Sequence, residues 1–214
     1  MDVSVRFFDL DGVSVDEALL AHDERGRVAR KATPVLRQRQ AASFHVLRVT
    51  LGEVLAVEPR ALAFHRSASG KPELLGAALH FNLSHSGGLG MLAWGPRALG
   101  ADVETLIARP SARLAGKILA PREFESWRAL PERDRQAWLT RAWTRKESVL
   151  KAMGSGLRIP PRAIDVMSAE RGANAASDSA REWGLELAGR CWAGVDWLDG
   201  IGEGCRAAVC VAAR

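Results

Sequence analysis

The sequence predicts an α+β fold in which two similar halves each combine a long helix with a small antiparallel sheet. Residues 41–56 carry apolar side chains at helical spacing, as on a helix with one buried face. Residues 132–153 form a second long helical segment, which ends where Gly154 supplies a typical helix stop. Residues 79–95 contain two apolar runs around a polar, Gly-rich turn, which is the pattern of two paired strands.

A faint internal duplication favours the division into two halves. Each long helix is followed by a turn and a strand, in residues 82–95 of the first half and residues 200–212 of the second. The identity between the two segments is too low to prove a repeat. We expect the halves to meet near residues 97–100, and we divide the chain into an N-terminal half, 1–98, and a C-terminal half, 99–214.

The N-terminal half begins with a predicted strand within residues 1–16, where apolar and polar side chains alternate. Residues 16–40 are rich in arginine and compatible with a helix, which Pro34 is expected to interrupt. Residues 64–74 predict a turn-rich loop around Lys71.

The C-terminal half begins with a predicted strand, 100–104. Residues 111–130 predict one or two helices broken at Pro121, before the long helix. Residues 170–181 are rich in Ala, Ser, Gly and Asn and predict a mobile loop. Four short apolar runs predict strands: 163–166, 184–187, 191–193 and 207–211.

Composition excludes several classes of protein and favours acidic partners. The chain has 214 residues and a formal net charge of +5. The basic residues are spread over segments that are predicted to fold and are not gathered in a low-complexity tail. Its apolar runs are too short for a membrane helix, and no signal peptide is visible, so we expect a cytoplasmic protein without membrane partners. Three cysteines without a CxxC spacing argue against a disulfide framework and against a zinc site.

The second long helix carries a possible catalytic group. Trp143, Glu147 and Lys151 are spaced i, i+4 and i+8, which stacks them along one helical face. One interpretation is a surface ion pair, which is common at this spacing. The other is a metal ligand or general base beside an ammonium that binds phosphate.

A pair of carboxylates on the strand at the start of the C-terminal half suggests a metal site. Strand alternation puts Asp102 and Glu104 on one face and Val103 on the other. Carboxylates on one face repel each other, unless water or a cation lies between them. They are therefore either a solvated acidic edge or ligands of magnesium, which takes one or two carboxylates together with substrate phosphates.

Two segments of the N-terminal half have the composition of anion sites. Residues 84–88 combine two hydroxyls, the imidazole of His85 and flexible backbone N–H groups, which suit either an anion-binding turn or an ordinary hairpin loop. Gly70 and Pro72 hold Lys71 in a tight turn, either as an ordinary surface lysine or as a phosphate contact.

Taken together, these motifs resemble those of the surfactin-type 4′-phosphopantetheinyl transferases. The resemblance runs from about residue 25 to the C-terminus and leaves residues 1–24 without a matching motif. It is carried by three groups: Gly70-Lys71-Pro72 with the run from Phe81 to Ser86; the run from Gly100 to Glu104; and the run from Trp143 to Ser148 with Lys151 and the run from Gly154 to Leu157. Ala101 replaces a bulkier aliphatic residue of the family.

The resemblance implies a pseudo-dimeric α+β fold and a group transfer. Members move 4′-phosphopantetheine from coenzyme A to a serine of an apo acyl or peptidyl carrier protein, with Mg²⁺ as cofactor. Acidic carrier proteins would suit the basic chain by electrostatic steering. We expect a monomer that does not bind nucleic acid.

The resemblance also implies roles for individual residues. Glu147 would be the general base for the carrier serine, directly or through a water molecule, and Lys151 would contact the transferring phosphate. The implied magnesium ligands are Asp102, Glu104 and Glu147. The implied coenzyme A contacts are Arg39, Arg48, Lys71, Ser84, His85, Lys146 and Lys151. Asp102 is counted with Glu147 and Lys151 as catalytic.

Two other functions would be compatible with part of this sequence. A basic nucleic-acid-binding protein is suggested by the charge and by the arginines of residues 25–39, but no binding motif or aromatic–basic interleaving supports it. A magnesium-dependent phosphoesterase could use the same carboxylates.

Overall fold

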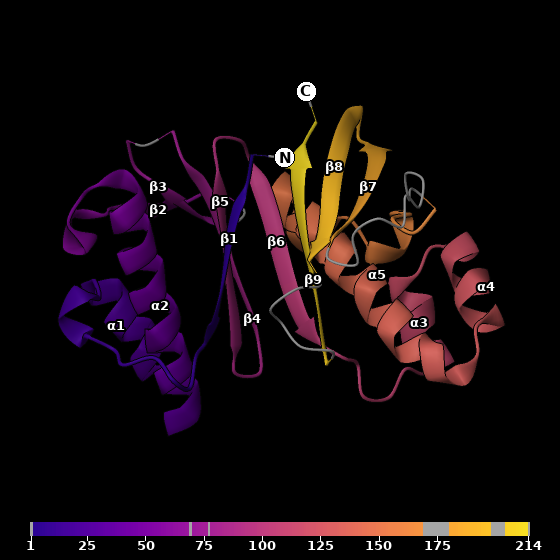
Figure 1. Cartoon of the computed structure of the whole chain (residues 1–214), viewed down its shortest axis with the longest axis horizontal. Coiled ribbons are helices and arrows are strands. Elements are labelled where there is room, and N and C mark those ends of the chain that lie inside the picture. Colours follow the sequence, from indigo (N-terminus) through magenta and orange to yellow (C-terminus); the bar gives the residue numbers. More distant parts are fainter. Residues whose placement is uncertain (1, 69, 77, 169–179, 198–203, 214) are drawn as a thin grey trace.

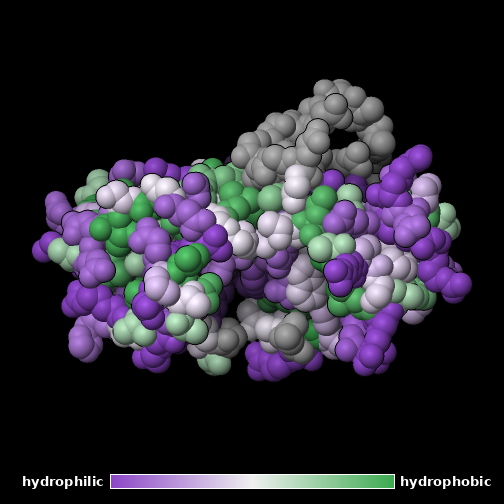
Figure 2. All heavy atoms as spheres, turned by 90° about the horizontal axis from the view of Figure 1, so that it is seen from below, coloured by the Kyte–Doolittle hydropathy of each residue, from purple (hydrophilic) through white to green (hydrophobic). Residues whose placement is uncertain are grey.

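The computed structural model describes residues 2–68, 70–76, 78–168, 180–197 and 204–213. It confirms the α+β class, with antiparallel sheets and helices in both halves. In Figure 1 the helices of the two halves lie on opposite outer sides, and the strands fill the space between them. Within the described ranges, no helix is both long enough and apolar enough to cross a membrane. Figure 2 shows hydrophilic residues over both ends of one face, with hydrophobic residues in smaller groups.

The N-terminal half contains a three-stranded antiparallel sheet in the order β1-β5-β4. Its core lies between this sheet and helix α2, where Leu47 and Leu51 meet Phe81 and Leu92. A short hairpin, β2-β3, forms a separate sheet. The elements are β1 (Ser4–Asp9), η1 (Glu17–Leu19), α1 (His22–Ala29), α2 (Pro34–Leu55), η2 (Pro59–Ala61), β2 (Phe64–Arg66), β3 (Pro72–Leu74), β4 (His80–Ser86) and β5 (Leu89–Gly95).

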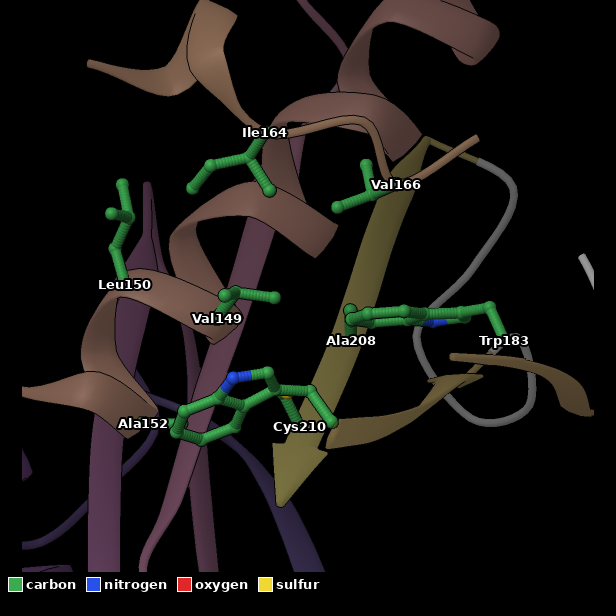
Figure 3. Packing of buried hydrophobic residues seen from close by; sticks show 9 residues of the cluster. Val149, Leu150, Ala152, Ile164, Val166, Trp183, Ala208 and Cys210 are labelled. Atoms are coloured by element: carbon green, nitrogen blue, oxygen red, sulfur yellow. The ribbon is translucent and has the colours of Figure 1, made fainter. Parts of the chain in front are cut away.

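The C-terminal half contains a four-stranded antiparallel sheet in the order β6-β9-β8-β7. Helix α5 packs on it through the cluster shown in Figure 3, in which Val149 of the helix faces Ala208 and Cys210 of the sheet. The elements are β6 (Leu99–Thr105), α3 (Ala112–Ile118), α4 (Pro121–Ala129), α5 (Glu132–Met153), η3 (Gly156–Arg158), η4 (Pro161–Ala163), β7 (Ala180–Leu187), β8 (Arg190–Trp197) and β9 (Cys205–Ala212).

Strand β6 approaches helix α5 more closely than a side chain would allow. A Cβ atom on Gly100 would lie 2.1 Å from the carbonyl oxygen of Ser148 and 2.3 Å from the backbone nitrogen of Ala152. Glycine is therefore required at this position. The close contact brings the next residues of β6 beside the end of α5 that carries Lys151.

Several predicted elements need correction. Pro34 begins helix α2 instead of interrupting it, because proline suits the first helical turn and Thr33 accepts a capping hydrogen bond of 3.2 Å from the backbone of Leu36. Residues 64–74 contain the β2-β3 hairpin. The predicted strand 163–166 is wrong: it falls on the end of η4 and an unpaired extended segment, whose Ile164 and Val166 are buried against α5.

Other predictions hold or lie outside the described residues. Both long helices are confirmed, and each has 22 residues. The predicted loop 170–181 falls mostly on residues 169–179, which lie outside the described part of the chain, and so does the start of the predicted strand region 200–212. The similarity of the two halves and the boundary at residue 98 stay predictions.

Candidate active site

The predicted site residues Asp102 and Lys151 meet where β4, β6 and α5 come together. Oδ1 of Asp102 accepts hydrogen bonds from Nζ of Lys151 (2.6 Å) and from Oγ of Ser84 (2.9 Å). Nζ of Lys151 also donates to Oγ of Ser84 (3.0 Å) and to the carbonyl of Ala101 (3.2 Å). Residues from three distant segments therefore form one polar cluster.

Burial dominates the electrostatics of Asp102. It raises the pKa of this carboxyl from 3.8 to about 6, although Lys151 acts in the opposite direction. The second oxygen, Oδ2, is buried and has no hydrogen-bond partner among the residues that the structure describes. An unpaired buried carboxylate oxygen is costly in an isolated protein, so Oδ2 is a strong candidate to bind a cation or a donor of a substrate.

Both oxygens of Glu104 are held by protein donors. Oε2 accepts a 2.7 Å hydrogen bond from Oγ of Ser86, and Oε1 accepts a 3.2 Å hydrogen bond from the indole nitrogen of Trp143. The sequence places Trp143 on the helical face of Glu147, and the structure adds a hydrogen bond that the spacing along the helix does not reveal.

Glu147 is half-buried on the same side of α5. Burial raises the pKa of its carboxyl, the positive charge of Lys151 lowers it, and the negative charge of Glu104 raises it again. The charges of Glu104 and Lys151 therefore shift the pKa values of both Asp102 and Glu147.

Side chains of β4, instead of a backbone ladder, join the two halves beside this site. The backbone nitrogen of Ala101 donates to Oδ1 of Asn82 (2.8 Å), and that of Thr105 donates to Oγ of Ser86 (3.1 Å). Between them, the nitrogen of Val103 donates to Oγ of Ser84 (3.4 Å). We call this row of contacts from Asn82, Ser84 and Ser86 the β4–β6 seam.

The seam corrects the expectation that Ser84 and His85 belong to a turn. Both residues lie in strand β4, and Gly87 with Gly88 makes the turn. Because side chains alternate along a strand, Ser84 faces β6, while His85 points to the other side. The surrounding protein atoms partly desolvate the His85 ring, which lowers its pKa, and the positive charges of Lys31 and Lys151 lower it further.

The carboxylates fit a cation that is completed by substrate oxygens better than a protein-only metal centre. Among the described residues, no group of three or more His, Cys, Asp or Glu side chains is poised to hold a metal ion. The unpaired Oδ2 of Asp102 and the nearby charge of Glu104 nevertheless favour a cation at this point. Magnesium typically uses one or two carboxylates together with substrate phosphates, so these residues suit it.

Lys71 lies at the junction of the halves but is engaged with the backbone. Its Nζ donates to the carbonyls of Leu99 (2.6 Å) and Lys151 (3.1 Å). Burial lowers the pKa of this lysine. The side chain ties the β2-β3 hairpin to the start of β6 and to the last turn of α5, close to Lys151.

The structure does not bring Lys146 to the site. Its ammonium group is fully buried, pairs with Glu123 at 2.5 Å, and donates to the carbonyls of Pro161 (3.1 Å) and Ile164. The expected coenzyme A contact is therefore corrected to a structural one. Lys146 points into the protein because it lies next to Glu147 on the helix, about 100° around its axis.

The two predicted arginines have separate environments. Arg48 is buried, and its guanidinium binds Glu24 at 2.7 Å and the carbonyls of Pro59 (2.9 Å) and Leu62 (3.1 Å). Arg39 forms a bidentate ion pair with Asp11 near the surface, and both N–O distances are 2.7 Å. Neither guanidinium contacts the Asp102 cluster directly in this conformation.

A cavity of about 330 Å³ lies on the α2 side of β4. It is lined by Arg27, Arg66, Phe44 and Leu83 among others. Partial desolvation lowers the pKa of Arg66, the charge of Arg27 lowers it further, and the charge of Asp23 raises it. Asp23 and Glu24 also line this cavity, and Arg27 is already paired with Asp23 at 3.0 Å, so the lining combines charges of both signs with aromatic and apolar walls.

Ser86 and Trp143 belong to the sequence motifs, but the sequence did not predict that both contact Glu104. Ser86 could have been found from strand alternation, because it lies on the same face of β4 as Ser84. Trp143 shares a helical face with Glu147, but its hydrogen bond to Glu104 depends on how β6 and α5 dock.

Comparison with known proteins agrees with the motifs. The sequence model of the 4′-phosphopantetheinyl transferase superfamily matches residues 98–210. The 4′-phosphopantetheinyl transferase HetI of Nostoc sp. is 40% identical over 149 residues, which cover 65% of this chain and 62% of that protein. The putative 4′-phosphopantetheinyl transferase slr0495 of Synechocystis sp. is 32% identical over 146 residues, 66% of this chain and 59% of that protein.

A surfactin-type relative also matches. The 4′-phosphopantetheinyl transferase Sfp of Bacillus subtilis is 26% identical over 171 residues, which cover 72% of this chain and 74% of that protein. Against HetI and slr0495, the chain spans about three fifths of the relative's length.

Proposed function

Because the chain belongs to the 4′-phosphopantetheinyl transferase superfamily, we propose that it transfers the 4′-phosphopantetheine group of coenzyme A to a serine of an apo carrier protein. The observation that supports this most is the Asp102 cluster. A buried carboxylate with one unpaired oxygen lies against an ammonium group, next to the carboxylates of Glu104 and Glu147. Such a cluster suits a substrate that carries phosphate charge.

The reaction forms one phosphorus–oxygen bond and breaks another. The serine oxygen of the carrier attacks the β-phosphorus of coenzyme A, and adenosine 3′,5′-bisphosphate leaves with the bridging oxygen. The serine proton passes to a base. Phosphoryl transfer of this kind depends mainly on positioning and on neutralising charge.

Glu147 is the proposed base. Burial raises the pKa of its carboxyl, which makes the carboxylate a better proton acceptor at neutral pH. It lies one helical turn from Lys151, so the base and the ammonium face the same region. The serine proton would reach Glu147 directly or through a water molecule.

The other carboxylates and Lys151 serve the pyrophosphate. Oδ2 of Asp102, together with Glu104 and Glu147, would hold Mg²⁺, which when bound neutralises pyrophosphate charge. The charge of Lys151 favours the ionised form of Asp102. Its side chain is 28% exposed, so its ammonium group is proposed to contact the pyrophosphate from the open side of the site. Ser84 orients both groups through its hydroxyl.

The nucleotide end of coenzyme A is proposed to bind on the α2 side of β4. Leu83 lines the cavity there, and His85 shares its strand face. Three arginines of the lining, Arg27, Arg48 and Arg66, outnumber its two carboxylates, Asp23 and Glu24, and Phe44 supplies an aromatic wall. With the nucleotide in this cavity, the proposed coenzyme A contacts are Arg39, Arg48, Lys71 and His85, and Ser84 lies at the pyrophosphate end.

The carrier partner is proposed to be an acidic acyl or peptidyl carrier protein, because the chain carries a net charge of +5. We keep a cytoplasmic, monomeric enzyme as the working prediction.

The test is a carrier assay. The protein is incubated with coenzyme A, Mg²⁺ and a panel of apo carrier proteins from fatty acid, polyketide and peptide pathways. Mass spectrometry then measures the mass of each carrier. We expect one carrier to gain one phosphopantetheinyl group. No gain on any carrier would overturn the proposal, and hydrolysis of coenzyme A without a carrier would point to a phosphoesterase.

A further inference from the structure

We propose that Ser86 and Trp143 are positioning residues that hold the Glu104 carboxylate in place for a divalent cation shared with the substrate pyrophosphate. The inference rests on the proposed function, and it assigns to two residues outside the predicted site a role in assembling that site. Neither residue would touch the substrate or the metal ion.

The hydroxyl of Ser86 has its proton committed to Glu104. Its oxygen accepts a hydrogen bond from the backbone nitrogen of Thr105 (3.1 Å) and lies 3.3 Å from the Thr105 hydroxyl. A hydroxyl has one proton and two acceptor positions. With Thr105 on the acceptor side, the proton points at Oε2 of Glu104, 2.7 Å away.

The indole of Trp143 holds the other oxygen from the opposite side of the site. Its nitrogen can only donate, and it lies 3.2 Å from Oε1 of Glu104. Trp143 is anchored in the cluster that α5 forms with α3 and α4, where it packs near Leu139 and Ala142. One helical turn further along lies Glu147, so the contact also sets Glu104 relative to the proposed base.

Two donors from different elements stop the carboxylate from rotating. Glu104 faces the negative charges of Asp102 and Glu147, so a free side chain would turn away from them in the absence of a cation. Each held oxygen accepts one protein hydrogen bond and keeps lone-pair capacity for a metal ion. The repulsion is thus retained in the folded protein and is relieved when a cation binds.

The measurement is the affinity for Mg²⁺, independent of turnover. Mg²⁺ is titrated by calorimetry into the full-length protein saturated with coenzyme A, with coenzyme A alone as the blank. Trp143→Phe keeps an aromatic ring but removes the indole N–H donor, and Ser86→Ala removes the hydroxyl. Each should weaken Mg²⁺ binding about 10–100-fold, as loss of an outer-shell partner typically does, and excess Mg²⁺ should restore transfer.

Three controls separate positioning from damage to the fold. Trp138→Phe changes another tryptophan of α5 in the same cluster and should leave Mg²⁺ affinity unchanged. Ser86→Thr keeps the hydroxyl and should retain most of the affinity. Coenzyme A binding without metal should be the same in all variants, and thermal melting shows that each one is folded.

The outcomes are distinct from those of the carrier assay. Wild-type Mg²⁺ affinity in Trp143→Phe and Ser86→Ala, or equal weakening in Trp138→Phe, would overturn the positioning role. So would a wild-type protein that binds no Mg²⁺ beside coenzyme A. If the affinities change as expected but no carrier is modified, the positioning role stands and the transferase proposal fails.

Discussion

Oδ1 of Asp102 accepts a 2.6 Å hydrogen bond from Nζ of Lys151, a residue 49 positions further along the chain. The Asp102 side chain is 3% exposed and that of Lys151 is 28% exposed. The pair therefore connects the buried floor of the site with its open side. It exists because β6 lies directly against the last two turns of α5, where Gly100 has no side chain to keep them apart.

Asp102 should make the protein less stable at neutral pH than at acidic pH. Burial raises its pKa from 3.8 to about 6, so across this window the folded protein binds a proton that the unfolded chain has released. The contribution of this residue to the free energy of unfolding therefore falls as pH rises through the window and stays lost above it. Chemical denaturation of wild type and Asp102→Asn, without divalent metal, measures the difference.

In that experiment wild type should lose stability relative to Asp102→Asn as the pH is raised. A difference that does not depend on pH would contradict the raised pKa. Asp102→Asn should also abolish transfer, which the carrier assay measures separately.

Glu147→Gln should slow transfer by about 10²–10⁴-fold, the usual contribution of a general base. The amide keeps the shape of the side chain but cannot accept the serine proton. Single-turnover kinetics are measured with an apo carrier that the wild-type protein modifies, and calorimetry measures the binding of coenzyme A. Together the two measurements separate chemistry from binding. Full activity in this variant would remove Glu147 from the mechanism, whereas retained coenzyme A binding is expected.

Gly100→Ala should destabilise the protein by about 1–3 kcal/mol or more, as overpacking of a tight interior does. The new methyl group would lie 2.1 Å from the Ser148 carbonyl, and backbone atoms cannot move aside as a flexible side chain does. Gly116→Ala in α3 is the matched control, because its nearest neighbour would be 3.9 Å away. Denaturation midpoints of both variants check the prediction, and similar losses in the two would argue against the close approach.

Lys146→Ala should lower stability by about 3–5 kcal/mol, because it leaves the Glu123 carboxylate buried without its cation. Glu123 also accepts hydrogen bonds from the backbone of Val166 and Met167, so the loss spreads to the segment after η4. Denaturation and calorimetry with coenzyme A are the two measurements. Unchanged stability with lost coenzyme A affinity would instead restore Lys146 as a ligand contact.

Local patterns were enough for the long helices and most strands. The buried stripe of residues 41–56 and the glycine stop at Gly154 act within a few residues, so the sequence alone reports them. The predicted strand 163–166 was wrong because a local pattern does not show what a segment packs against. Its apolar residues are buried against α5 instead of pairing with a strand, and a short apolar run looks alike in both settings.

The sequence by itself determined which residue types could carry phosphate chemistry, and the family that uses them. Motif spacing placed Asp102 and Glu104 on one strand face and Glu147 and Lys151 on one helical face, because these periodicities are properties of the local backbone. Only the tertiary structure decided how the faces meet. The bond from Lys151 to Asp102, the contact from Trp143 to Glu104, and the burial of Lys146 all join segments distant in sequence, and packing between elements sets such distances.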